Sequence, residues 1–358
     1  MEKLLSLLKS IPEYVITAYE GIIAELTVPA EIDGVAVTGI GQMNRSHMIA
    51  ALHADTRMPL VVICQDDMAA KRLQEELKAF LGITPPVLPS RDLTLYDTAV
   101  VSRAWEQKRL RQFYELMNGL TSLQILSWEA LSQRTMPPTV LAGCAFTLET
   151  GKEYNLDALA ARISGAGYSR TSMVEGPGQF AVRGGIIDIF SPAADYPVRA
   201  EFFGEELDTM GYFDPDTQRR TENVSSVIIL PVGETQPRLH PQGLDGLCDD
   251  LGNLIARQKR RKTPNEDLIK TLERDLEKYQ NGVQNPASDR YMALIYPEMA
   301  TAMDYIPENA IVVLCDQGAL KRTARTRMDE LGMQLDSMLQ GGLLAGTVRL
   351  CLPMGRFL

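Results

Sequence analysis

The stretch PLVVICQDDMAAKRLQEELKAFL, residues 59–81, decides the fold class. It begins with a short, continuous apolar run, which is typical of a strand buried on both faces of a sheet. The spacing then becomes helical, with Asp66 or Asp67 able to cap the first turn. Four apolar residues of this helix can share one face: Met68, Leu73, Leu77 and Leu81. A buried strand followed by an amphipathic helix is the repeating unit of a parallel α/β sheet.

The same pattern of short apolar runs and helical segments recurs toward both ends of the chain. A second helix is predicted at 105–117 and a second short strand at 123–126. Two further apolar runs, AIVVLC at 310–315 and TVRLCL at 347–352, indicate buried strands. Residues 244–279 are helical and highly charged, with a break near Thr263-Pro264. Residues 1–14 predict a short amphipathic helix and not a signal peptide, because no small-residue cleavage site follows.

The middle of the chain has a different sequence pattern, richer in strand-like runs, which starts after the double proline at 137–138. Asn155–Gly165 is a predicted helix, and three strand-like runs follow at 180–190, 198–203 and 226–230. The simplest architecture is one α/β domain that is split by a small α+β domain with an antiparallel sheet. We expect the first half at 1–135, the inserted domain at 136–230 and the second half at 231–358.

Composition excludes several classes of protein. Among 358 residues, 36 Lys and Arg stand against 46 Asp and Glu, so the formal net charge is −10. This acidic balance argues against a protein that binds DNA by bulk charge. The five cysteines are an odd number without CxxC spacing, and three of them, Cys64, Cys315 and Cys351, stand in apolar runs. We expect free, buried thiols in a reducing cytoplasm and no zinc site.

A nucleotide site is the first chemistry to consider. Residues 34–43, GVAVTGIGQM, place Gly34 and Gly39 at P-loop spacing, with Gly41 also available. Gln42 and Met43 stand where a lysine and a magnesium-binding hydroxyl are needed, and neither side chain can do that work. The glycines alone are a weak signal, and a simple turn explains them better.

The second half of such a site is equally incomplete. Asp316 follows the apolar run at 310–315, as in a DExx box, but the next residue is the amide Gln317. An amide cannot act as a general base, and Asp316 alone also fits a cap at the end of a strand. Together the two regions predict a degenerate P-loop NTPase-like fold that neither hydrolyses nor binds NTP. We expect no catalytic residue, no cofactor and no metal.

Two groups of charged residues remain. The run Arg257–Lys262 (RQKRRK) is the most basic stretch, and it fits either a solvated helix face or a contact with DNA phosphates. The inserted domain has one lysine and six arginines against 13 acidic residues. Arginines on strands of an acidic domain are candidates for pairing with carboxylates of a partner, and Arg170, Arg183 and the nearby Phe190 fit such a site. Internal ion pairs and a core phenylalanine are the alternative.

Residues 168–192, YSRTSMVEGPGQFAVRGGIIDIFSP, and 197–219, PVRAEFFGEELDTMGYFDPDTQR, carry a family resemblance. They resemble the second domain of bacterial transcription-repair coupling factors (Mfd) and are similar to the matching domain of the excision-repair protein UvrB. The likeness extends to LPSRDLTLYD at 88–97. It implies a UvrB-like module whose first domain is split by the second. Gln42, Met43 and Gln317 show the loss of nucleotide motifs that separates the coupling factors from UvrB.

The resemblance also implies partners. In the family, the second domain binds UvrA and so recruits excision repair to a stalled RNA polymerase. Arg170, Arg183 and Phe190 match the contacting positions, whereas Ala181 stands where UvrB has a further arginine. Between Asp97 and Trp105 there is no room for the DNA-inserting hairpin of UvrB.

Full-length relatives continue with regions that bind RNA polymerase and with an ATP-dependent motor on double-stranded DNA. We therefore expect a cytoplasmic, non-catalytic N-terminal fragment that acts as an adaptor. Two alternatives stay open: a nucleotide-dependent repair enzyme of UvrB type, and a DNA-binding module that uses residues 257–262.

Overall fold

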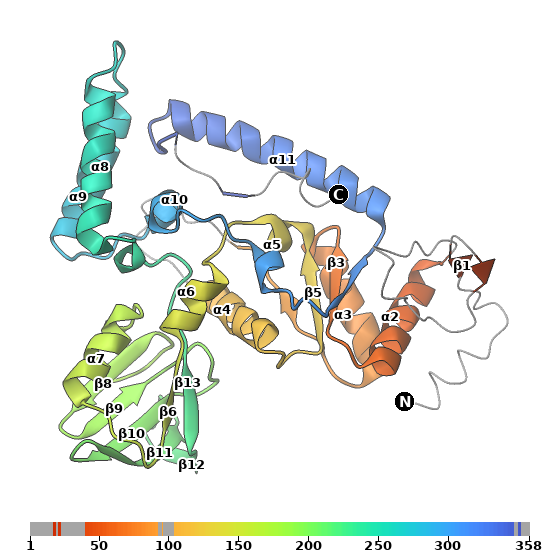
Figure 1. Cartoon of the computed structure of the whole chain (residues 1–358), viewed down its shortest axis with the longest axis horizontal. Coiled ribbons are helices and arrows are strands. Elements are labelled where there is room, and N and C mark those ends of the chain that lie inside the picture. The colour runs from red at the N-terminus through yellow and green to blue at the C-terminus, as the bar shows by residue number, and fades with distance from the viewer. Residues whose placement is uncertain are drawn as a thin grey trace.

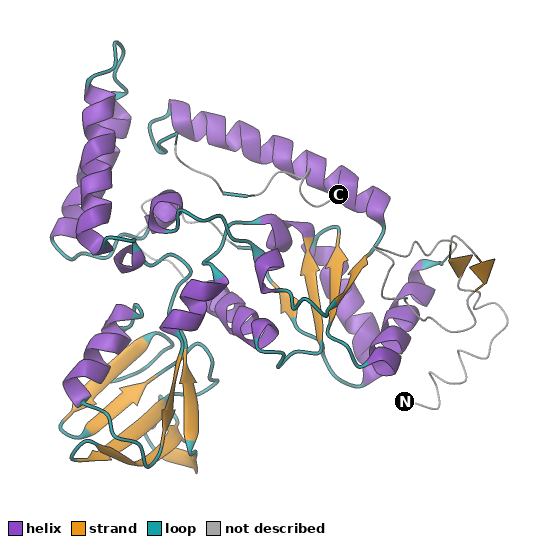
Figure 2. Ribbon diagram, in the orientation of Figure 1, coloured by secondary structure: helices purple, strands orange, loops and turns teal. Residues whose placement is uncertain are grey.

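The computed structural model describes residues 17–18, 21–22, 40–91, 95, 104–346 and 350–351. Figures 1 and 2 show a parallel α/β part, a β-rich module at one end, a helical hairpin and a long helix, α11. The fold is a mixed α/β structure with parallel and antiparallel sheets, as predicted. The predicted helix at 1–14 and most of the predicted strand at 347–352 lie outside the described residues. Cys351 forms an isolated bridge with Gln133.

Four parallel strands form the sheet of the α/β part, in the order β14 (Ile311–Leu314), β3 (Leu60–Cys64), β5 (Leu123–Ser127) and β4 (Val87–Leu88). Helices α2 (Gln42–Thr56) and α3 (Asp67–Leu81) pack on one face, and α4 (Ala104–Met117) and α5 (Trp128–Ser132) on the other. Successive residues of β3 enter these two cores alternately, so all five are buried. This explains the continuous apolar run at 60–64.

Strand β14 differs from its prediction. The run at 310–315 does form a strand, but β14 is an edge strand, and Val312 and Leu314 are 45% and 40% exposed. The apolar run therefore predicts the strand correctly, but the predicted burial of this strand on both faces is wrong. Periodicity shows that a segment can be buried and does not show which strands lie at the edge.

Helix α3 begins and ends where its sequence predicts. Asp66 is the N-cap, and its Oδ1 accepts a hydrogen bond of 2.7 Å from the backbone N–H of Ala69. Gly82 ends the helix with a φ of 71°. The predicted buried face is wrong at Met68, which is 76% exposed. Five residues at 100° each place Met68 about 140° from Leu73, so Ala70 occupies the buried position instead.

The β-rich module contains a six-stranded sheet in the order β12-β11-β10-β9-β8-β7, and every pair except β7–β8 is antiparallel. The strands are β7 (Ser169–Arg170), β8 (Gln179–Arg183), β9 (Ile186–Ile189), β10 (Val198–Phe203), β11 (Glu206–Phe213) and β12 (Arg220–Asn223). The predicted run at 180–190 is thus a hairpin and not one strand. Helix α7 (Leu156–Gly165) covers one face of this sheet.

The predicted strand at 226–230 exists but does not join the six-stranded sheet. It is β13 (Ser226–Ile229), which pairs antiparallel with β6 (Phe146–Glu149) in a separate two-stranded sheet. Both strands contribute to the same core as α7 and the larger sheet. Before β6, helix α6 (Pro138–Cys144) places Leu141 in the core of the α/β part. We therefore propose that the inserted module starts near Phe146.

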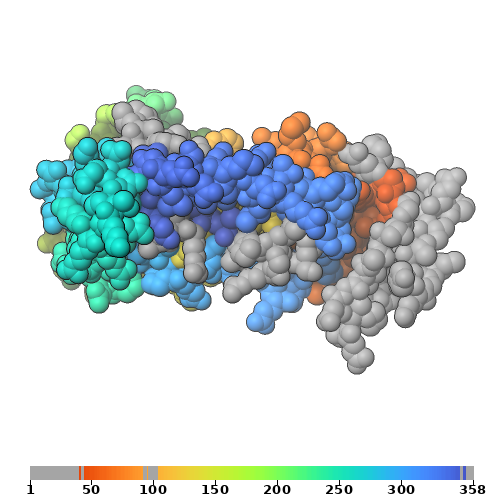
Figure 3. All heavy atoms as spheres, turned by 90° about the horizontal axis from the view of Figure 1, so that it is seen from above, coloured from red at the N-terminus to blue at the C-terminus, as the bar shows by residue number. Residues whose placement is uncertain are grey.

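The remaining helices follow the module. Helices α8 (Gly243–Lys259) and α9 (Glu266–Gln280) form a hairpin, and short turns lead through α10 (Met292–Ile295) to β14 and α11 (Gln317–Gln340). Figure 3 shows α11 as a ridge across the upper face, with the α8–α9 hairpin at one end. Among the described helices, none has the length and apolar character that crossing a membrane requires.

A buried ion network fixes the connector that follows the module. Glu234 is 0% exposed, and its Oε1 lies 2.7 Å from Nε of Arg109. Thr135 donates a hydrogen bond to its other oxygen, and Arg91 reaches both Glu234 at 3.8 Å and Asp289 at 2.5 Å. Burial alone would raise the pKa of Glu234, but Arg109 and then Arg91 lower it below its ordinary value. Five separate segments of the chain meet here.

Candidate functional site

The turn between β8 and β9 positions Arg183. Two glycines form it, and both are required: Gly184 has a φ of 59°, and a Cβ on Gly185 would lie 2.9 Å from the carbonyl oxygen of Phe202. The backbone N–H of Phe202 also bonds to the carbonyl of Gly185 at 2.7 Å. The turn is therefore held against β10, and Arg183, the last residue of β8, stands at a fixed tip.

A buried carboxylate lies beside this tip. Asp188 of β9 is 0% exposed and lies opposite Ala181 of β8 and Arg199 of β10. Arg199 binds it in a bidentate manner, with Nε 2.7 Å from Oδ1 and Nη2 2.9 Å from Oδ2. Arg183 donates through Nη2 to the same Oδ2. We call Arg183, Asp188 and Arg199 the Asp188 face.

The two arginines of the Asp188 face differ in exposure. The side chain of Arg199 is 18% exposed, whereas that of Arg183 is 47% exposed. The hydrogen bonds to Asp188 raise the pKa of Arg199. A guanidinium has five N–H donors, and among the described residues Arg183 donates to Asp188, so most of its half-exposed fork can reach a partner.

Phe190 lies below this face and not on it. It is 8% exposed and packs with Val174, Ala181 and Phe213 in a small apolar cluster of its own. The guanidinium of Arg199 stacks over the ring of Phe213, with its carbon 4.6 Å from the ring centre. The cluster therefore packs against the guanidinium of Arg199 on the side of the sheet.

Arg170 does not join the Asp188 face. It is exposed on the edge strand β7, in register with Phe180, whose side chain is buried in the core beneath α7. Side chains alternate along a strand, and Arg183 follows Phe180 by three residues, so the two arginines belong to opposite faces of the sheet. The structure brings Arg183 and Arg199 together and separates Arg170 from both.

Sequence reasoning missed Asp188 and Arg199. A signal was available, because an aspartate inside the apolar run IIDIF must be buried on one face or end the strand. Arg199 stands on the next strand, but its register with Asp188 follows from the RGG turn and the intervening loop. That register could not be read from periodicity alone.

The degenerate nucleotide region is partly described. Gly41 is the N-cap residue of α2 and makes no side-chain cap, while Gly39 lies outside the described residues, as do the side chains of Gln42 and Met43. Asp316 is the N-cap of α11, and its Oδ1 accepts a hydrogen bond of 3.0 Å from the N–H of Ala319. Gln317 is the first residue of that helix. This geometry gives Asp316 the role of a helix cap.

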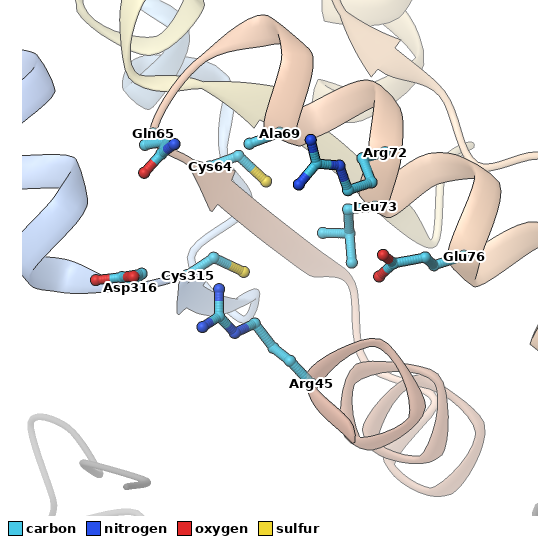
Figure 4. A pocket seen from close by; sticks show the side chains of 9 residues that line it. All are labelled: Arg45, Cys64, Gln65, Ala69, Arg72, Leu73, Glu76, Cys315 and Asp316. Atoms are coloured by element: carbon cyan, nitrogen blue, oxygen red, sulfur yellow. The ribbon is translucent and has the colours of Figure 1, made fainter. Parts of the chain in front are cut away.

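A cavity of about 180 Å³ opens between these elements, at the carboxyl ends of β3 and β14. Figure 4 shows Arg45 of α2 and Arg72 of α3 reaching into it, with Cys64 and Cys315 at its floor. Within the described ranges, no group of three His, Cys, Asp or Glu side chains could hold a metal ion.

The basic run at 257–262 only partly lies on a helix, because α8 ends at Lys259 and the run continues into the turn before α9. Most of its side chains are exposed. Lys259 pairs with Glu273 of α9 at 2.7 Å. The observed arrangement is a solvated helix end that still presents several cations.

Comparison with known proteins gives the class of the module first. Residues 146–234 match the family model of the UvrB interaction domain. This span begins at the first residue of β6 and ends at Glu234, two residues past the last core residue of the module, Val232.

Relatives that match over most of the chain share one name. The chain is 26% identical over 317 residues, 88% of its length, to a transcription-repair-coupling factor of Bacillus subtilis. It is 29% identical over 343 residues, 90% of its length, to that of Myxococcus xanthus. It spans 27% of the length of each of these two relatives. The resemblance to the N-terminal, UvrB-like module of the transcription-repair coupling factors is therefore confirmed.

Proposed function

We propose that this chain is a non-catalytic adaptor module that recruits UvrA during transcription-coupled repair. The recruiting surface is the Asp188 face of the inserted module, and Arg183 is its main contact. One observation carries the proposal: a half-exposed arginine is held at a rigid hairpin tip by a buried carboxylate. A guanidinium fixed in this way loses little conformational entropy when it binds a carboxylate of a partner.

The other two residues implied by the family resemblance take different roles in this proposal. Phe190 is buried, so it supports the β8–β9 hairpin and does not touch the partner directly. Arg170 lies at the open edge of the sheet, on β7. A partner that contacts both Arg170 and Arg183 must therefore extend around this edge.

The α/β part serves as a scaffold in this proposal, as a degenerate P-loop NTPase-like domain. Two observations support the loss of NTP chemistry. Asp316 uses its carboxylate to cap α11, and the residue after it is an amide. RNA polymerase and double-stranded DNA belong to the proposed context of a longer protein, through regions outside this chain.

The test is a calorimetric titration of the chain with purified UvrA, run in parallel with Arg183→Ala. We expect the wild-type chain to bind and the variant to bind about tenfold or more weakly, since a central arginine anchor contributes roughly 1–3 kcal/mol. Arg257→Ala is the matched control, because it removes an exposed arginine from α8, outside the module. Its affinity should equal that of the wild-type chain.

Two results would reject the proposal. One is a folded wild-type chain that does not bind UvrA. The other is equal weakening by Arg183→Ala and Arg257→Ala, which would show a general charge effect. Tight ATP binding by the wild-type chain would favour an enzyme of UvrB type instead.

A further inference from the structure

Two cysteines stand level with each other on neighbouring strands. The parallel register of β14 and β3 pairs Leu314 with Ile63, and the next residues are Cys315 and Cys64. The backbone N–H of Cys315 continues the ladder with a 2.9 Å bond to the carbonyl of Ile63. Adjacent strands lie about 4.8 Å apart, which is inside the range of about 4.4–6.8 Å between Cα atoms that a disulfide spans.

The two side chains also share one face and one opening. Cys64 and Cys315 belong to the same apolar cluster between the sheet and helices α2 and α3, and they are 2% and 7% exposed. Both line the cavity of about 180 Å³, which is large enough to admit water-sized molecules. In Figure 4, Arg45 points at Cys315 from α2.

The environments of the two thiols are unequal. The neighbouring thiol of Cys64 lowers the pKa of Cys315, and Arg45 lowers it further against the opposing effects of burial and Asp316. The pKa of Cys64 is raised, by Cys315 first and then by burial. The pKa values of the other three cysteines, Cys144, Cys248 and Cys351, are raised, in each case mainly by burial. Cys315 is thus the thiol best prepared to react as a thiolate.

We propose that Cys64 and Cys315 form an oxidation site, which a hydroperoxide such as hydrogen peroxide converts into a disulfide joining β3 to β14. The thiolate of Cys315 attacks the peroxide, so that the O–O bond breaks, Cys315 becomes a sulfenic acid and hydroxide leaves. The sulfur of Cys64 then attacks the sulfenic sulfur, and the departing hydroxide takes the proton of Cys64 to form water. A cellular thiol reverses the bond by exchange, as is usual for transient cytosolic disulfides.

The experiment treats the whole chain with a small excess of hydrogen peroxide, blocks remaining thiols under denaturing conditions and maps the peptides without reduction. We expect a linked Cys64–Cys315 peptide as the first product, removed by dithiothreitol, with the other three cysteines still reduced. The result that overturns the proposal is oxidation of Cys144, Cys248 or Cys351 before this pair. Separate sulfinic acids at Cys64 and Cys315 without a link would overturn it as well.

Variants test the order of the steps. In Cys64→Ser, Cys315 should form a sulfenic acid that dimedone labels, whereas in Cys315→Ser the thiol of Cys64 should survive the same dose. Arg45→Gln should slow the disulfide about three- to tenfold, and Arg45→Lys should restore part of the rate. Arg72→Gln is the matched control, because Arg72 lines the same cavity but is not among the groups that act on Cys315. Equal slowing by Arg45→Gln and Arg72→Gln would contradict the assigned role of Arg45.

Discussion

Two fully buried carboxylates, Asp188 and Glu234, each bind two arginines, but they place those arginines differently. Around Glu234, the side chains of Arg91 and Arg109 are 2% and 0% exposed, and five segments of the chain close over them. Around Asp188, one arginine is mostly covered and Arg183 remains 47% exposed. The same ion chemistry therefore joins parts of the fold in one place and presents a charged group to the outside in the other.

The difference lies in which elements supply the arginines. Those of the Glu234 network come from the α/β part and meet a connector that returns from the inserted module. Those of the Asp188 face come from β8 and β10, which flank β9 in one sheet. Among the described residues, helix α7 packs on the opposite face of this sheet, and the small apolar cluster beneath Arg199 contains no helical residue. Both places contain ion pairs, so the exposure of the cation is what distinguishes the proposed binding role of Arg183 from the structural role of the Glu234 network.

Removing the carboxylate of Glu234 tests this comparison with the largest expected effect. Glu234→Gln leaves Arg109 buried without its counter-charge, so the free energy of unfolding should fall by about 3–5 kcal/mol. Urea unfolding measures this change. Glu298→Gln, at an exposed position, is the control and should leave the free energy unchanged within about 0.5 kcal/mol. A loss below about 1 kcal/mol for Glu234→Gln would mean that the network is not a structural anchor.

Asp188→Asn is the corresponding change in the module. It should lower the free energy of unfolding less than Glu234→Gln does, and it should weaken the binding of UvrA. In Asp188→Asn, water can still reach Arg183, so we expect a loss of about 1–3 kcal/mol in unfolding free energy. Since Arg183 loses its fixed position but keeps its charge, the affinity for UvrA should fall, by no more than in Arg183→Ala. Unfolding and calorimetric titration of the same preparation give both values. If Asp188→Asn is destabilised but binds UvrA with full affinity, binding does not require Asp188 to hold Arg183 in position.

Acid should weaken the Glu234 network in a defined direction. The folded-state pKa of Glu234 is lowered from an ordinary value of 4.5, so its contribution is complete above that value and is lost as the pH falls through and below it. One such group contributes a slope of up to about 1.4 kcal/mol per pH unit. Unfolding free energies between pH 7 and pH 3 should show a shallower acid loss in Glu234→Gln than in the wild-type chain. Equal slopes would contradict the assigned pKa direction.

The smallest effect concerns the two arginines of the proposed binding surface. Arg170 and Arg183 belong to opposite faces and share no contact, so their effects on UvrA affinity should add within about 0.5 kcal/mol. A double-mutant cycle with both alanine variants measures this. A coupling above about 1 kcal/mol would show that one pocket of the partner holds both side chains.

Local signals in the sequence predicted the elements well. The cap at Asp66 and the helical spacing up to Leu81 predicted α3, and the continuous apolar run at 60–64 predicted a strand buried on both faces. These features depend on neighbours within a few residues. The exposure of β14 could not be predicted in the same way, because it depends on which elements cover the strand. The exposure of Met68, in contrast, follows from helical spacing, and its predicted burial was an error in that spacing.

For the candidate site, the sequence indicates individual residues but not how they are arranged in space. The sequence predicts Arg183 as a contact residue, whereas its partner Asp188 and its neighbour Arg199 depend on the register of three strands. The burial of Phe190 and the separation of Arg170 also follow from this register. A change of one residue in it would exchange the two faces of the sheet.

The pairing of β6 with β13 has a consequence for engineering. The chain enters the module through one of these strands and leaves through the other, with Phe146 directly opposite Ile229. The two points of attachment are therefore separated by one inter-strand spacing, about 5 Å. A short peptide could close the scaffold after excision, and the same two ends could be spliced into a surface loop of another protein. Because closing so narrow a gap costs little chain entropy, the module with its proposed recognition surface should be transferable to another protein as one unit.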